Sequence, residues 1–351
     1  MKAEARQRLR RLLLAGVGLV IVIVLLLAIA GTGQDAGTVV SIFSTRFLGI
    51  FIEAAPFLLL GTLASGLIES FISSDDIARW VPRNPILATL MGTFMGFTFP
   101  VCECGVVPVV RRLYTKGLPM SVGVTFLLAA PVINPVVLVS TYVAFGFGAV
   151  LIGRFVITIV VAMVVGLVFA FAGRPQEILQ PASLAPVAGG SGDVPQQPIS
   201  GEVIPLYART PRKSLMVGLR DALTMAGDEF FEMGRYLIIG SLLAALMQTL
   251  VSQDVLLALG RGPIISVIVM QALAFLLSVC STVDAFLALA FTGTFTTGSI
   301  LAFLSFGPMV DIKSTLMFAG VYRRRVVLYL IVLPLLMTML IGIWLNLNVV
   351  F

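Results

Sequence analysis

The chain has 351 residues, of which 59% are hydrophobic and 11% are charged, with a net charge of +6 at pH 7 and no histidine. Soluble proteins carry about 25% charged residues, so this composition indicates a membrane protein. It excludes histidine metal sites and histidine bases, and three cysteines do not make a disulfide scaffold. The basic residues lie at segment ends and in loops, where membrane topology uses them, so nucleic-acid binding is not expected.

Residues 1–44 are expected to form a basic cytoplasmic N-terminus and a first transmembrane helix, separate from the two repeats described below. The apolar run 12–30 is longer than the roughly 7–15 residues of a signal peptide's apolar region. An uncleaved signal anchor would give the same topology. The basic residues that precede the run are Lys2, Arg6, Arg8, Arg10 and Arg11.

The region 45–173 is predicted to be the first membrane repeat. Its apolar stretch 86–110 has basic residues on both flanks, and a single crossing would leave one flank outside. Two half-helices that meet near the membrane centre would keep both flanks in the cytoplasm. Pro100 and Gly105 bracket the expected tip, as a helix break in a membrane requires. We therefore favour a re-entrant hairpin, with one crossing as the alternative.

The next apolar segment, 119–143, is interrupted by Pro131 and Pro135, which remove amide donors from the helix ladder. A further span follows at 150–172. Residues 174–216 are rich in proline, glycine, serine and glutamine, which predicts a disordered cytoplasmic linker that ends with the start of an amphipathic helix. Residues 217–351 are predicted to be the second repeat.

The two repeats align along their length with small changes in loop length. Residues 58–73 match 237–252, Cys102 matches Cys280, and Asn134 matches Asp311. Loops that are basic in one copy are neutral in the other, so the positive-inside rule predicts opposite orientations. Inverted repeats with interrupted helices are typical of secondary transporters whose site lies between the repeats.

The cysteines occupy the predicted tips. Cys102 and Cys104 flank Glu103, and in an unwound stretch residues two apart face the same side. We expect the two thiols to converge and Cys280 to join them in a metal site. Thiolates select soft ions such as Cu(I), Zn(II) and trivalent arsenic or antimony. The alternative is that the cysteines are small apolar packing residues.

Several acids lie within or at the ends of apolar segments. An acid in a membrane is costly, so it is usually paired, protonated or functional. One interpretation is local pairing, for instance of Asp311 with Lys313. The other is proton coupling, for which the candidates are Glu103, Asp284, Glu53 and Glu232.

The sequence resembles a known family at several of these motifs. Residues 100–108 (PVCECGVVP), 116–117 (KG) and 126–135 (FLLAAPVINP) resemble the YraQ-like predicted permeases, relatives of the ArsP-type arsenical efflux permeases. Residues 278–280 and 306–313 resemble the second half of that family. The resemblance covers about residues 45–350 without the linker. This chain has Glu103 between its cysteines and keeps Asn134-Pro135, whereas the arsenical branch reads Cys-Ser-Cys and lacks Asn-Pro.

The sequence thus predicts an all-α polytopic membrane protein with two inverted repeats and broken helices. We expect a multi-pass permease of the bacterial inner membrane, with its C-terminus outside, for a soft metal, a metalloid or a thiol-reactive small solute. Proton coupling is one option, and a channel built from two hairpins is the alternative function. The expected substrate site comprises Cys102, Glu103, Cys104, Cys280, Asn134, Pro131, Pro308 and Asp311.

No enzymatic activity and no cofactor are expected. The chain contains no GxxxxGK[ST] motif for ATP hydrolysis. Without histidine, a cysteine nucleophile would lack its usual activating base. The expected partners are the lipid bilayer and a small-molecule or ion substrate. The sequence also allows a homo-oligomer, and a soluble metal chaperone or thioredoxin-like protein as a partner.

Overall fold

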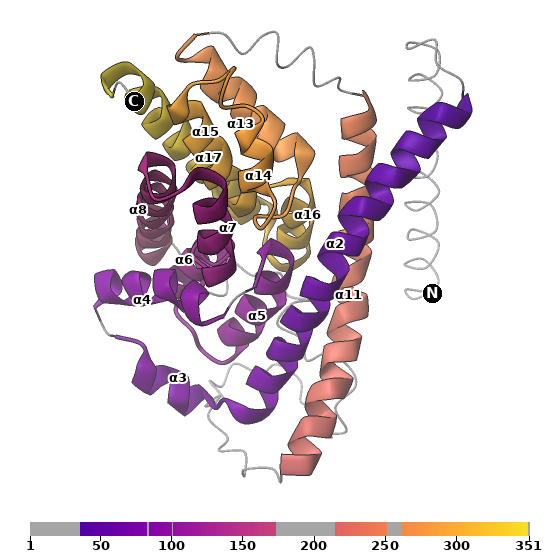
Figure 1. Ribbon diagram of the computed structural model, residues 1–351. Coiled ribbons are helices and arrows are strands. Elements are labelled where there is room, and N and C mark those ends of the chain that lie inside the picture. Colours follow the sequence, from indigo (N-terminus) through magenta and orange to yellow (C-terminus); the bar gives the residue numbers. More distant parts are fainter. Residues whose placement is uncertain (1–35, 83, 100, 173–214, 251–261, 350–351) are drawn as a thin grey trace.

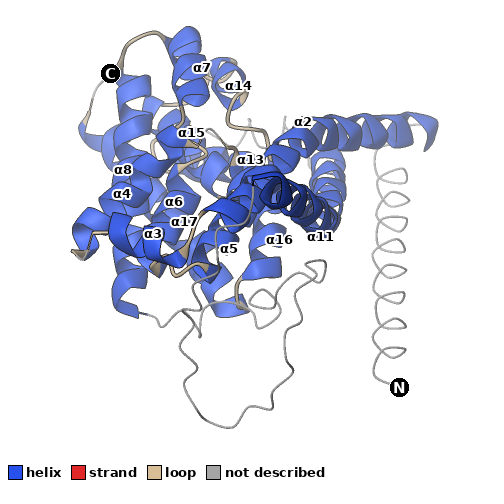
Figure 2. Ribbon diagram, turned by 90° about the horizontal axis from the view of Figure 1, so that it is seen from below, coloured by secondary structure: helices blue, strands red, loops and turns tan. Residues whose placement is uncertain are grey.

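The structure is a computed structural model that describes residues 36–349 except 83, 100, 173–214 and 251–261. The described residues form helices and connecting loops, with no strand among them (Figure 2), which confirms the all-α prediction. Five segments of this described part are long and apolar enough to cross a membrane, as a polytopic protein requires. The helix predicted at 12–30 and all but the last two residues of the linker predicted at 174–216 lie outside the described residues.

Two long helices, α2 (Ala36–Phe71) and α11 (Leu215–Leu250), form an antiparallel pair along one side of the molecule (Figure 1). Each has 36 residues, which at about 1.5 Å per residue exceeds the ~30 Å hydrocarbon core. Arg46 near the start of α2 donates to the carbonyl of Gln248 near the end of α11. Gly66 lies directly against the backbone of Ala222, so the two helices pack closely.

The short helix α3 (Ser74–Trp80) leads from α2 into a pair of half-length helices, α4 (Pro85–Thr98) and α5 (Glu103–Thr115). With 14 and 13 residues, each is about 20 Å long, too short to cross the hydrocarbon core alone. The helix α5 runs along α2 in the same direction, because Gly105 lies against Gly61 and Lys116 donates to the Glu69 carbonyl. The segment therefore leaves on the side where α2 ends, which is the geometry of the predicted hairpin.

A broken helix and a full-length helix complete the first half. They are α6 (Met120–Ala129), α7 (Pro135–Phe145) and α8 (Ala149–Ala172). The break between α6 and α7 falls at the predicted position. Asn134 caps α7, its Oδ1 accepting from the Val137 amide at 3.0 Å, and Pro135 occupies the first turn, where it needs no amide partner.

The second half repeats this order with α13 (Ile265–Leu277), α14 (Asp284–Leu289), α15 (Thr297–Met309), α16 (Ile312–Val321) and α17 (Arg324–Asn348). The hydroxyls of Ser266 and Thr296 lie 3.1 Å apart, so the start of α13 lies beside the start of α15. The segment between them therefore also enters and leaves on one side. Asp311 caps α16 in the way that Asn134 caps α7.

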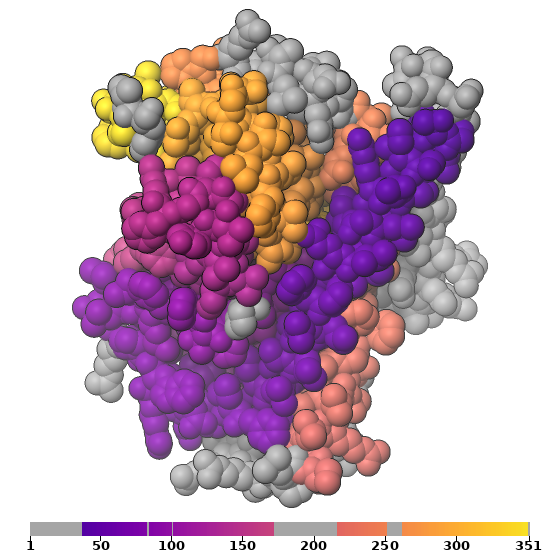
Figure 3. Space-filling view, in the orientation of Figure 1, coloured from indigo at the N-terminus to yellow at the C-terminus, as the bar shows by residue number. Residues whose placement is uncertain are grey.

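Equivalent helices pack alike in the two halves. In the first, α4 packs on α6 and α6 on α8; in the second, α13 packs on α15 and α15 on α17. Across the halves, α5 contacts α16 and α7 contacts α14. The symmetry is approximate, because α14 has 6 residues where α5 has 13, and α2 packs on α5 whereas α11 packs on α16. In Figure 3 the orange and yellow segments of the second half lie above the purple segments of the first half, while the indigo α2 and the salmon α11 extend along the other side of the molecule.

Candidate functional site

The two hairpin tips meet where the halves join. Cys102 is the residue before the first turn of α5, with extended backbone angles (φ −79°, ψ 179°), and Cys280 lies between α13 and α14. Their exposed fractions are 3% and 2%. Ser278 ends α13 in the left-handed conformation (φ 48°), which a residue with a Cβ adopts at a cost. Its hydroxyl accepts from the Ile312 amide at 3.3 Å, which fixes the second tip to the start of α16.

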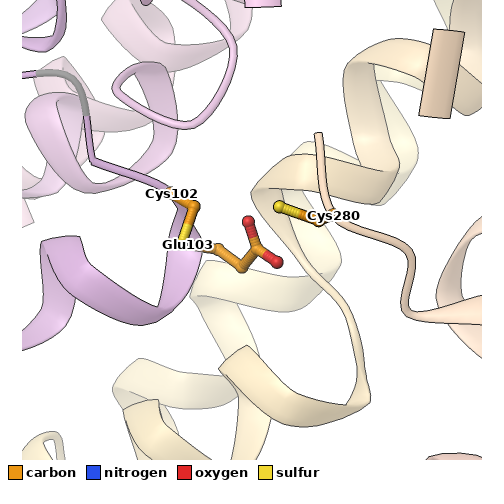
Figure 4. A group of neighbouring side chains, drawn as sticks. All are labelled: Cys102, Glu103 and Cys280. Atoms are coloured by element: carbon orange, nitrogen blue, oxygen red, sulfur yellow. The ribbon is translucent and has the colours of Figure 1, made fainter. Parts of the chain in front are cut away.

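Two thiols and a carboxylate converge at this junction. The sulfurs of Cys102 and Cys280 and a carboxylate oxygen of Glu103 all lie within 4.8 Å of one another. Figure 4 shows the Glu103 carboxylate and the Cys280 sulfur pointing toward each other from opposite halves of the chain. Two sulfur ligands with one oxygen ligand suit a soft or borderline ion better than a hard one such as Mg²⁺.

Cys104 occupies a different environment from the other two cysteines. It is the second residue of α5 and is fully buried, and it is not part of the group within 4.8 Å. Its thiol still interacts with that of Cys102 and lies in the electrostatic surroundings of Lys313. The helix α5 begins at Glu103, two residues earlier than a fully unwound Cys-Glu-Cys would need, so Cys104 lies within the first helical turn while Cys102 precedes it.

A buried ammonium group completes the cluster. The Nζ of Lys313 lies 3.4 Å from Glu103 Oε1 and 3.5 Å from Asp311 Oδ2, and the lysine is 1% exposed. The Asp311–Lys313 pair is the local pairing that the sequence offered as one interpretation. The pair between Glu103 and Lys313 links positions 210 residues apart and was not predicted from the sequence. A lysine within an apolar segment was the available signal.

The long helices approach this cluster at equivalent glycines. Gly61 of α2 lies against the backbone of Gly105. Gly240 of α11 lies against Lys313, where an added Cβ would come within 2.9 Å of the lysine Cα. Because any side chain at either position would meet backbone, these two glycines set the distance between the long helices and the site.

The other predicted acids belong to separate ion pairs. The two carboxylate oxygens of Asp284 accept from Arg154 at 3.1 and 2.6 Å. Glu232 pairs with Arg111 at 3.0 Å, and Glu53 of α2 is half-buried within electrostatic range of Lys313. Asp284 and Glu232 therefore have arginine counter-ions in the described structure, whereas Glu53 lies near the lysine of the cysteine cluster.

The remaining predicted site residues shape the breaks. Asn134 caps α7, Pro131 lies in the break before it, and Pro308 lies inside α15. Glu229 was not among the residues predicted from the sequence; it is fully buried beside the Ser65 hydroxyl and 3.6 Å from Arg112. An acid inside a long apolar helix was its signal.

Comparisons with known proteins identify the family of this chain. A family model described as "Predicted permease" (ArsP_1) matches residues 40–347. "UPF0718 protein YcgR" of Bacillus subtilis is 42% identical over 286 residues, 81% of this chain and 90% of that protein. The "Putative two-component membrane permease complex subunit" of Streptococcus mutans is 38% identical over 287 residues, 80% of this chain and 87% of that protein. No solved structure matches the chain.

Proposed function

Because this chain belongs to the predicted permease family ArsP_1, we propose that it is a secondary transporter for a soft metal ion, a metalloid or a thiol-reactive small solute. The observation that supports this substrate class is the convergence of Cys102, Cys280 and Glu103 between the two halves. Transporters with inverted repeats bind their substrate at this kind of junction, where the half-helices end.

The two halves are proposed to face opposite sides of the membrane. At one end of the molecule, Lys116 lies beside Glu69 and the Tyr114 ring is 6.3 Å from that of Tyr322, the residue before the basic run 323–325. This end gathers the basic loops of both halves. At the other end, Gly298 donates to the Asn346 side chain at 2.9 Å. The positive-inside rule then assigns the basic end to the cytoplasm and the end of α17 to the outside of the inner membrane.

Proton coupling is proposed to involve Glu103, with Asp284, Glu53 and Glu232 as secondary candidates. A thiol must lose its proton to become a ligand, so an adjacent carboxylate provides a place for that proton during the exchange. Asp284 and Glu232 are weaker candidates than Glu103, because they form ion pairs with Arg154 and Arg111 while the Glu103 carboxylate is the one that lies beside the two thiols.

Transport into proteoliposomes tests the proposal. We expect uptake of Cd²⁺ that saturates with concentration, responds to an imposed pH gradient and is lost when Cys102 and Cys280 are both replaced by serine. Flux that neither saturates nor responds to a gradient would support the alternative, a channel. Full Cd²⁺ uptake by the double variant would refute the thiol site and leave the cysteines as packing residues.

The partners are also a proposal. The name of the Streptococcus relative describes a subunit of a two-component complex. We propose that this chain, too, works in an assembly, as a homo-oligomer or with a second protein such as a soluble metal chaperone or a thioredoxin-like protein. Purification of the tagged full chain from its native host under mild detergent tests this, and a monodisperse monomer with no co-purifying protein would contradict it.

A further inference from the structure

The two halves of the chain differ in the residue that caps the second helix after each break. Asn134 caps α7 with one oxygen, and Asp311 caps α16 in the same way, its Oδ1 accepting from the Ser314 amide at 2.6 Å. An asparagine performs this capping role as well as an aspartate. The charge of Asp311 is therefore not needed for the helix cap, and its second oxygen, Oδ2, lies 3.5 Å from Lys313.

The lysine is also specific to the second half. Its equivalent in the first half is Val136, which is exposed on the surface of α7 rather than directed to the junction. Lys313 instead lies in the junction between two acids, Glu103 from the first half and Asp311 from its own. One cation thus lies within ion-pair distance of two carboxylates.

The carboxylate of Glu103 is only partly satisfied. Its Oε1 is 3.4 Å from Lys313, and its Oε2 is buried without a hydrogen-bond partner in the described structure. The hydroxyl of Ser281, next to Cys280, is likewise buried without a partner. Buried polar atoms of this kind are costly unless something binds them. Figure 4 shows that the carboxylate is directed toward the cysteine side of the junction.

We propose that Lys313 is a tethered counter-cation that occupies Glu103 while the site is empty and moves to Asp311 when a soft metal cation binds. This inference rests on the proposed function and narrows its substrate to a cation, since the lysine competes with a positive charge for the same carboxylate. Only a short side-chain movement is needed, because Nζ is already 3.5 Å from Asp311. Each thiol that becomes a ligand passes its proton through Glu103 to solvent before the metal engages that carboxylate, while the lysine keeps its own proton.

The tethered lysine stabilises the empty site. An uncompensated buried carboxylate is strongly unfavourable, and Lys313 provides the counter-charge that the empty site needs. It also weakens substrate binding, because the metal must displace the ammonium group from Glu103. A transporter needs such moderate affinity to release its cargo, and an empty site with its own cation can reorient without carrying a bare charge.

Two variants with opposite expected effects on Cd²⁺ affinity test the proposal in the purified full chain. Binding of Cd²⁺ is followed by thiolate-to-cadmium absorbance, with Mg²⁺ as a hard-ion control. We expect Lys313→Gln to bind Cd²⁺ on the order of tenfold more tightly, because the competing cation is gone. Asp311→Asn keeps the cap, as Asn134 shows, but leaves the lysine with Glu103 as its remaining acidic partner in the cluster. It should therefore weaken Cd²⁺ binding by a similar factor.

A double variant separates competition from packing. In a Glu103→Gln background the metal no longer has to displace the ammonium group of Lys313 from Glu103. Lys313→Gln should then no longer tighten Cd²⁺ binding. Equal affinities for wild type and Lys313→Gln, or weaker binding in both single variants, would overturn the tether. If Lys313→Gln does not purify as a folded protein, Asp311→Asn decides, and unchanged affinity there rejects the proposal. Wild-type protein that binds no Cd²⁺ would instead refute the proposed function itself.

Discussion

Arg154 and Asp284 form a bidentate ion pair that joins α8 of the first half to α14 of the second. Both side chains are almost completely buried, and Arg154 also donates to the Thr141 hydroxyl at 2.8 Å. Each partner would be an uncompensated charge in an apolar interior without the other. The pair therefore fixes the short helix α14, whose 6 residues provide little packing of their own, against the first half.

Removal of one partner of this pair should destabilise the protein strongly. Arg154→Met leaves Asp284 as a buried unpaired acid, which costs about 3–5 kcal/mol. The double variant Arg154→Met/Asp284→Leu should recover most of that loss, because it leaves no buried charge. Thermal unfolding in detergent measures both. As a matched control, Arg235→Met breaks a half-exposed pair with Glu232 and should change stability by at most about 1 kcal/mol. A single variant as stable as the double would contradict this account.

The three cysteines should contribute unequally to Cd²⁺ binding. We expect Cys102→Ser and Cys280→Ser each to weaken binding by at least about 100-fold, because each removes a soft ligand from a set of three. Cys104→Ser should have a smaller effect, since this thiol lies in the first turn of α5 outside that set. Isothermal titration of the three single variants gives the order, and equal losses in all three would show that the site rearranges when it is loaded.

The glycines that approach the site should not tolerate a side chain. Gly61→Ala places a methyl group against the Gly105 backbone, and such overpacking costs about 1–3 kcal/mol. Gly240→Ala should behave alike because of its contact with Lys313. Gly49 lies in the same helix as Gly61 with nothing within 4 Å of an added Cβ. Gly49→Ala should therefore be neutral or stabilise by up to about 1 kcal/mol, and the difference in melting temperature between the two α2 variants is the measurement.

The orientation of the halves can be mapped by labelling. Single cysteines introduced at Thr115 and Arg324 should react with a membrane-impermeant maleimide only from the cytoplasmic side. Those at Thr294 and Gly146 should react only from the outside, because the positive-inside rule assigns the basic loops to the cytoplasm. The native cysteines are buried and give a low background. Labelling of Thr115 and Thr294 from the same side would exclude inverted repeats.

The sequence by itself determined the class of the protein and the positions of its breaks. Its apolar composition and basic loops predict a polytopic helical membrane protein, and proline and glycine mark the interruptions near Cys102 and before Asn134. These signals are local, because an amide that proline removes and a charge that a membrane excludes act within a few residues of their own position. The sequence alignment also paired Cys102 with Cys280, and the structure places these two thiols together.

Only the tertiary structure decided which charges meet. Lys313 contacts Glu103 and Arg154 contacts Asp284 across 210 and 130 positions, and no periodicity in the sequence encodes such pairs. The orientation of Cys104 also depended on where α5 begins, because one helical residue turns a side chain by about 100°. Ion pairing in an apolar interior is set by the packing of α5 against α16 and of α7 against α14, and that packing exists only once the two halves have come together.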